Sequence, residues 1–192
     1  RNGFPTVSRK KVLSALQDGS FDWNRVLPGR KQARKDEMIS KVMAVIPEIA
    51  SPLFRQEVEL IPGADEMLKA ISSSDIRLGL VTSTRKMFMD EKLHPLRRAG
   101  IDQIFDAVIT TDDAPKKKPA ADPLIECAKR LSLEPNKMVY VGDAVVDIRA
   151  GKAAGTMTIG VLTGVDDHES LKAENPDALI DSVADLKDIL AF

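Results

Sequence analysis

Two carboxylates that are four positions apart follow a short apolar segment in the run Val139-Tyr-Val-Gly-Asp-Ala-Val-Val-Asp147. The apolar residues predict a buried strand, and Gly142 permits a sharp turn out of it. Asp143 then lies at the carboxyl end of the strand, where open α/β sheets bind ligands, and Asp147 lies one helical turn further on. Two hard oxygen donors suit Mg²⁺. Because Asp-x-x-x-Asp alone also describes a solvated helix start, this interpretation depends on other motifs upstream.

Two polar segments precede this run, and each follows a predicted strand. In Leu80-Val-Thr-Ser-Thr84, hydroxyl and backbone N–H groups could hold phosphate oxygens, although the same residues could cap the next helix. In Lys116-Lys-Lys-Pro119, the lysine before the proline could project a compact positive charge into a crevice. A solvated surface loop is the alternative for these lysines.

Strands and helices alternate from residue 57 onward, which predicts an α/β fold with a parallel sheet and helices on both faces. The predicted strands are at 76–81, 107–110, 138–141, 158–162 and 178–180. The predicted helices begin near 63, 87, 122 and 147, and a last one runs through Leu186, Ile189 and Leu190. Residues 1–56 have a helical pattern without a convincing strand. Helices are expected at 8–16 and at 35–49, where Pro47 should disturb the end of the second.

Composition excludes several classes of protein. The 192 residues are 43% hydrophobic and carry a net charge of -1, so a core is possible and no basic field recommends nucleic acid as a partner. No apolar run approaches the roughly 20 residues that span a bilayer. The single Cys127 cannot form an internal disulfide, which favours a reducing, cytoplasmic location. The oligomeric state is left open.

Hydroxyl, lysine and paired acids, each just after a strand and in this order, are much more specific together than alone. The sequence resembles motifs two to four of the haloacid dehalogenase-like (HAD) superfamily of phosphohydrolases, in its phosphoglycolate phosphatase-like branch. The resemblance covers about residues 57–192. It implies a HAD-like Rossmannoid core at 57–192 and a small helical cap at 1–56.

The resemblance also implies a chemistry and a role for each residue. A phosphoryl group is transferred to an aspartate, and the aspartyl-phosphate is then hydrolysed. Thr82 and Ser83 would bind the phosphate, Lys118 would neutralise it, Asp143 would bind Mg²⁺, and Asp147 would bind Mg²⁺ or orient its water. The expected function is Mg²⁺-dependent hydrolysis of a small phosphomonoester, such as phosphoglycolate.

The first motif of the superfamily, an Asp-x-Asp on an N-terminal strand, does not occur in this sequence. That motif supplies the nucleophile, so we expect the nucleophile and the first core strand upstream of residue 1, and no turnover by the 192 residues alone. Two enzyme alternatives share the same core, a pyrophosphatase and a β-phosphoglucomutase-like phosphotransferase. An alternative from another class is a catalytically inactive binding or regulatory module.

Overall fold

The computed structural model describes residues 8, 16–17, 20–27, 29 and 31–190. The strands are β1 (Leu16–Gln17), β2 (Ser20–Phe21), β3 (Gly79–Val81), β4 (Ala107–Ile109), β5 (Val139–Gly142), β6 (Met157–Val161) and β7 (Ala178–Ile180). The helices are α2 (Trp23–Val26), α3 (Gln32–Gln56), α4 (Ala64–Ser72), α5 (Met89–Lys92), α6 (His94–Arg98), α7 (Asp122–Leu131), α8 (Val145–Ala154) and α9 (His168–Ala173), with 3-10 turns η1 (Lys86–Phe88), η2 (Pro135–Lys137) and η3 (Val183–Asp188).

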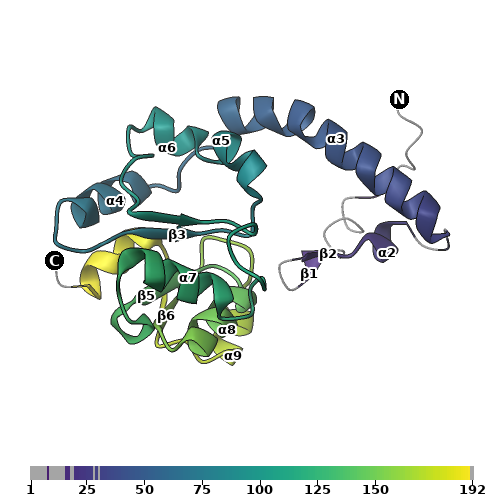
Figure 1. Ribbon diagram of the computed structural model, residues 1–192. Helices are drawn as coiled ribbons and strands as arrows, with labels where there is room; N and C mark the ends of the chain where they lie inside the picture. Colours follow the sequence, from purple (N-terminus) through teal and green to yellow (C-terminus); the bar gives the residue numbers. More distant parts are fainter. Residues whose placement is uncertain (1–7, 9–15, 18–19, 28, 30, 191–192) are drawn as a thin grey trace.

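Strands β3 to β7 are parallel, as the alternating pattern predicts, but they form two sheets where one was expected (Figure 1). One sheet pairs β3 with β4, and the other has the order β5-β6-β7. Among the described residues, β3 and β5 each have a strand partner on one side only. These two strands are more exposed than their neighbours β4 and β6. Strands of parallel sheets are normally buried, and an unpaired strand edge leaves backbone N–H and C=O groups without partners. The free edges of β3 and β5 are therefore unusual for this class of fold.

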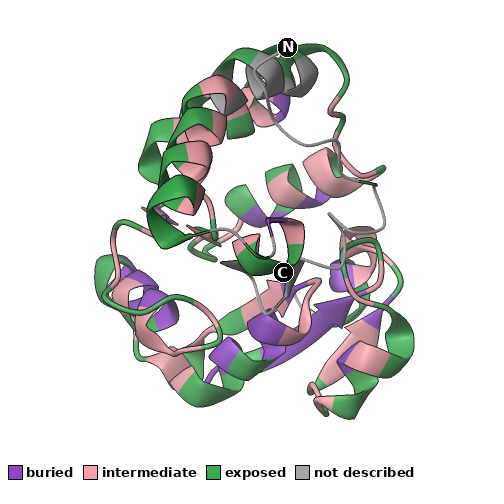
Figure 2. Ribbon diagram, turned by 90° about the vertical axis from the view of Figure 1, so that its right-hand side faces the viewer, coloured by how far each residue is buried: buried purple, intermediate pink, exposed green. Residues whose placement is uncertain are grey.

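Helices cover both faces of the strands because side chains alternate along each strand. A core cluster on one face joins α4 and η3 to β6 and β7, and Leu78 and Val141 pack against it. A second cluster packs α7 against β4. On the opposite face of β5 and β6, Tyr140 and Thr158 lie close to Gly151 of α8. Figure 2 shows that buried residues concentrate in these strands and their adjacent helices. The predicted α/β fold with helices on both faces is confirmed.

An aspartate stands immediately before β4 and before β7, and each one bonds to the neighbouring strand. Asp106 accepts a hydrogen bond from the backbone N–H of Leu78 at 2.8 Å. Asp177 accepts from the backbone N–H of Thr158 at 2.7 Å and from its hydroxyl at 2.9 Å. Both carboxylates therefore connect the starts of two parallel strands.

The N-terminal region differs from the expectation in two ways. The predicted helix at 8–16 lies almost wholly outside the described residues, but β1 and β2 form a short antiparallel pair where no strand was expected. The second helix, α3, does not end near Pro47 but continues to Gln56. A proline removes one backbone donor and strains the preceding turn, yet a long helix can continue beyond it. Figure 1 shows α3 leading from the α/β region to the N-terminal elements.

The junction after α3 is held by one side chain from α6. The guanidinium of Arg98 donates to the carbonyl oxygen of Arg55 at 3.2 Å and to that of Val58 at 2.6 Å. Helix α3 also contacts α5 and α6. Within the described part of the chain, none of the helices has both the length and the apolar character that crossing a membrane requires.

The carboxylate of Asp113, just after β4, gives a pH-dependent prediction. It accepts from the backbone N–H of Thr110 at 2.8 Å and from Arg130 at 2.7 Å. The hydroxyl of Thr110, which also donates to this carboxylate, then the guanidinium of Arg130 and the backbone N–H of Thr110, hold the pKa of Asp113 well below its usual value. We expect Asp113→Asn to lower the free energy of unfolding by about 1 kcal/mol at pH 7. The stabilisation from a lowered pKa is fully present above the unfolded pKa of 3.8 and is lost as the pH falls from there toward the lower pKa of the folded protein, so this difference should shrink below pH 3.8.

Urea unfolding of both proteins between pH 7 and pH 2.5 measures this difference. A destabilisation by Asp113→Asn that is equally large at the lowest and highest pH would contradict the assignment.

Candidate active site

The loop after β4 carries Lys118 across to the other sheet. Its ammonium nitrogen lies 2.5 Å from Oδ1 of Asp147 in α8 and 3.1 Å from the hydroxyl of Tyr140 in β5. The two charged side chains are only 10% and 6% exposed. Lys118 therefore joins the carboxyl ends of β4 and β5 in one buried ion pair, where charges interact more strongly than in water.

Asp147 is fixed through both of its carboxylate oxygens. Oδ1 also accepts from the Tyr140 hydroxyl at 3.1 Å, and Oδ2 accepts from the backbone N–H of Ala144 at 3.2 Å. The carboxylate lies directly over Gly142, where an added Cβ would be 2.3 Å from the Cβ of Asp147. The glycine that ends β5 is thus required by this close approach.

Tyr140 lies between the lysine and the aspartate. Burial, and next the negative charge of Asp147, raise the pKa of Tyr140 well above its usual value. The phenol therefore stays protonated near neutral pH and donates to Asp147 while it accepts from Lys118.

Asp143 is held by the loop that follows β6. Oδ2 of Asp143 accepts a hydrogen bond from the backbone N–H of Val165 at 2.9 Å. The backbone carbonyl oxygen of Asp143 accepts one from the backbone N–H of Asp166 at 3.0 Å. Asp166 in turn accepts from the N–H of Val145 at 2.7 Å. A Cβ added at Gly164 would lie 1.9 Å from Oδ2 of Asp143, so the carboxylate rests against the glycine backbone. Oδ1 of Asp143 has no protein hydrogen bond among the described residues.

The hydroxyl residues after β3 form local contacts. Thr82 donates its backbone N–H to Ile109 at 2.9 Å, and its hydroxyl accepts from the N–H of Thr84 at 3.1 Å. Thr84 accepts at its carbonyl from Thr111, so the loops after β3 and β4 are connected. Of the predicted site residues, the structure brings Lys118 and Asp147 into contact. Among the described residues, neither Thr82 nor Ser83 has a hydrogen bond to that pair. Ser83 is exposed.

The donor set at this edge fits Mg²⁺ in part. Asp143 offers a free carboxylate oxygen, a hard donor of the kind that Mg²⁺ prefers. Both oxygens of Asp147 already accept hydrogen bonds, which suits it better to orienting a water or the lysine than to direct coordination. No group of three or more His, Cys, Asp or Glu side chains that could hold a metal ion occurs among the described residues.

The motifs did not predict Tyr140, Gly164 or Asp166 as parts of this site. The sequence contained one usable signal for Gly164, a glycine just after a predicted strand. The contact between the loops after β5 and β6 depends on tertiary packing, and no local pattern encodes it.

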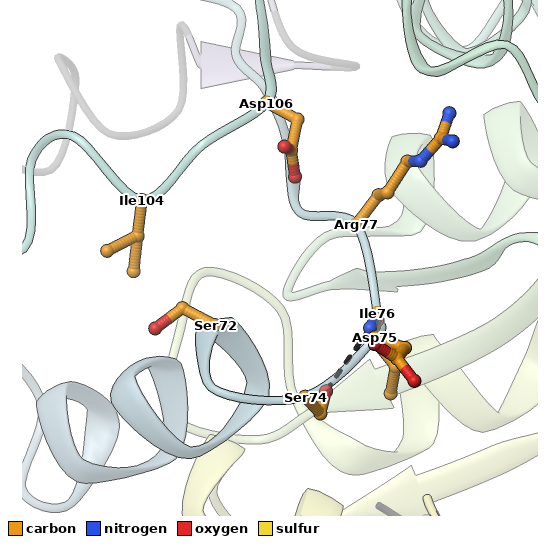
Figure 3. A pocket seen from close by; sticks show the side chains of 7 residues that line it. All are labelled: Ser72, Ser74, Asp75, Ile76, Arg77, Ile104 and Asp106. Carbon is orange, nitrogen blue, oxygen red and sulfur yellow. Dashed lines mark hydrogen bonds between the residues drawn. The ribbon is translucent and has the colours of Figure 1, made fainter.

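A cavity of about 380 Å³ lies away from this cluster. Figure 3 shows its walls, which come from the end of α4 and from the segments that lead into β3 and β4. The lining residues are Ser72, Ser74, Asp75, Ile76, Arg77, Ile104 and Asp106. The cavity therefore lies at the amino ends of these strands, and no predicted site residue lines it.

Comparison with known proteins identifies relatives among the phosphoglycolate phosphatases. A phosphoglycolate phosphatase of Salmonella choleraesuis is 38% identical over 127 residues, which are 66% of this chain and 49% of that protein. The phosphoglycolate phosphatase of Escherichia coli K12 is 36% identical over the same shares of the two chains. The chain thus spans about half the length of the curated relatives it matches.

Solved structures share the fold. A Haemophilus somnus protein, described as a predicted phosphoglycolate phosphatase, superposes with a TM-score of 0.80 at 21% identity, over 97% of this chain and 84% of that one. A β-phosphoglucomutase from Clostridium difficile gives a TM-score of 0.69 at 20% identity, over 94% and 78%. The profile of the haloacid dehalogenase-like hydrolases matches residues 9–161. The chain therefore belongs to the haloacid dehalogenase-like hydrolase family.

Proposed function

We propose that this chain forms most of a Mg²⁺-dependent phosphatase that hydrolyses a small phosphomonoester, of the phosphoglycolate type, through an aspartyl-phosphate. The observation that carries the proposal is the buried Lys118–Asp147 pair, together with the carboxylate of Asp143, four residues before Asp147, whose second oxygen has no protein hydrogen bond among the described residues. A fixed cation and a free carboxylate at the carboxyl edge of the strands are what an anionic phosphorus centre needs from a protein.

In this proposal the side chains act on the substrate's phosphoryl group directly, through one another, or through the metal ion. The hydroxyls of Thr82 and Ser83 donate hydrogen bonds to its oxygens. Lys118 neutralises charge on the group, and Asp147 holds the lysine in place. Asp143 binds Mg²⁺, which supplies further neutralisation of phosphoryl charge.

The nucleophile is proposed to come from a strand upstream of residue 1. The support is the free edges of β3 and β5. Leu78, just before β3, and Val141 of β5 pack against one core cluster, but among the described residues the two strands have no ladder between them. A strand between these edges would pair with both and end beside the site, because ligands gather at the carboxyl ends of parallel strands.

The proposed division of the chain is a cap at residues 1–56 and a core at 57–192. It is supported by α3, whose described side chains are all exposed or intermediate. The basic residues Lys31 and Arg34 of this region are exposed, as a solvated helix face would be. A small phosphorylated metabolite is the proposed partner and the cytoplasm the proposed location, the latter supported by the buried free thiol of Cys127.

The decisive test is phosphate release by the protein that includes its upstream segment, with and without Mg²⁺. We expect hydrolysis of 2-phosphoglycolate or another small phosphomonoester only with the metal, and a loss of about 10²–10³-fold in kcat/KM for Asp143→Asn. The exposed Asp75→Asn variant, at the opposite strand ends, is the control and should remain active. The 192 residues alone should release no phosphate.

The outcomes separate the alternatives. Release of phosphate from pyrophosphate alone would identify a pyrophosphatase, and interconversion of sugar phosphates without net release would identify a phosphotransferase. Failure of the longer protein to act on any phosphate ester with Mg²⁺ would leave the inactive binding module.

A further inference from the structure

The hydroxyl of Tyr140 completes a closed set of three hydrogen bonds that the proposed chemistry does not require. Lys118 donates to it at 3.1 Å, it donates to Oδ1 of Asp147 at 3.1 Å, and Lys118 also donates to that oxygen at 2.5 Å. A phenylalanine would fill the same space without two of these three contacts.

The ring itself has a fixed position. It extends from β5 toward α8, where a Cβ added at Gly151 would lie 3.4 Å from Cδ1 of Tyr140. The lysine nitrogen lies over the ring at 5.9 Å from its centroid and reaches the hydroxyl at 3.1 Å, so it contacts both parts of the side chain. The hydroxyl is therefore presented to Lys118 from a rigid support.

The two acceptors, Asp147 and Tyr140, restrict how the ammonium group of Lys118 can rotate. An ammonium group carries three N–H donors and rotates about a flexible stem. With one donor bonded to Asp147 and another to Tyr140, rotation is restricted and one N–H remains for an anion. A single acceptor would leave the group free to turn about one bond.

We infer that Tyr140 is a positioning residue, whose hydroxyl fixes the orientation of the Lys118 ammonium for binding an anion. The inference deepens the proposed phosphatase function and rests on it for the identity of the anion. The positioning itself is a property of the resting protein and can be measured without catalysis.

The test observes the lysine ammonium directly by ¹H–¹⁵N NMR of ¹⁵N-lysine-labelled 192-residue protein. Exposed lysines exchange their protons with water quickly, whereas a buried, doubly bonded ammonium should give a slowly exchanging signal that disappears in Lys118→Met. In Tyr140→Phe the Lys118 signal should shift, and its exchange rate should rise about fivefold, as expected for the loss of one hydrogen bond.

Thr158→Val is the matched control, because Thr158 is the strand partner of Tyr140 and its buried hydroxyl bonds to Asp177 instead. This variant should leave the Lys118 signal unchanged. Backbone amide spectra verify that each variant is folded. If Tyr140→Phe is unfolded, the same measurement on Tyr140→Leu, which fits inside the space of the ring and has no polar group, replaces it.

Two results would overturn the inference: no slowly exchanging Lys118 signal in the parent, or the same signal and exchange rate in the variant without the hydroxyl. In the longer protein, the same substitution should lower kcat about fivefold with a smaller change in KM. If Tyr140→Phe changes the exchange rate of the Lys118 signal but the longer protein hydrolyses no phosphate ester, the positioning role of Tyr140 stands and the proposed phosphatase function is rejected.

Discussion

Lys118→Met should destabilise the protein by about 3–5 kcal/mol, because it leaves the buried carboxylate of Asp147 without its cationic partner. The pair is joined at 2.5 Å, and neither side chain is more than 10% exposed. Equilibrium unfolding in urea measures the loss as a lower midpoint at an unchanged slope. Adding Asp147→Asn to the same protein should recover part of it, because the uncompensated charge is then removed.

The control for this prediction is Lys129→Met. Lys129 lies 3.9 Å from Glu126 on the surface of α7 and is 79% exposed, so its ion pair should contribute less than about 1 kcal/mol. If Lys118→Met and Lys129→Met had equal effects, the Lys118–Asp147 pair would not be a buried interaction of the folded protein.

Gly164→Ala should weaken Mg²⁺ binding by about 10- to 100-fold, as changes to groups that orient a metal ligand typically do. The added Cβ would lie 1.9 Å from Oδ2 and 2.2 Å from the Cβ of Asp143. Because the second of these atoms cannot rotate away, the whole side chain has to move, and it loses its bond to Val165. Isothermal titration of Mg²⁺ into the 192-residue protein measures the affinity without any need for catalysis.

Gly100→Ala is the matched control for that experiment. Gly100 has a φ of +70°, so alanine strains the backbone there, but nothing lies within 4 Å of the added Cβ. It should therefore lower stability without changing Mg²⁺ affinity. Equal affinities of Gly164→Ala and the parent would show that Asp143 does not hold the metal in this position.

The sequence predicted the α/β region well because its strands and helices have strong local signals. Helix α7 occupies the predicted residues, from Asp122 with its following proline to Leu131. Strands β5 and β7 were also located closely, since short apolar runs between turn residues have few other uses. The N-terminal region was less predictable because α3 continues through Pro47, which local propensity alone disfavours.

The candidate site was predictable in its charged residues but not in their arrangement. Lys118 and the two aspartates were identified from their positions after strands, and the structure places the lysine against Asp147. The sequence did not indicate that Asp147 would bond through both oxygens, or that Tyr140 would join the pair. Such contacts arise when a loop from one sheet packs on a helix of the other, so residues distant in sequence determine them. The phosphate and metal roles of Thr82, Ser83, Lys118, Asp143 and Asp147 stay predictions.

The aspartates before β4 and β7 have a consequence for how the active-site edge can vary. Parallel strands have no tight turn to set their alignment, and sliding by one residue would reverse which side chains face the core. Asp106 bonds to the backbone N–H of Leu78, just before β3, and Asp177 to that of Thr158, the second residue of β6, so a slipped alignment would lose those bonds. Because alignment is secured at the amino ends, loops at the opposite ends can lengthen or change composition without displacing the strands. The architecture thereby separates the part that maintains the framework from the part that adapts to a substrate.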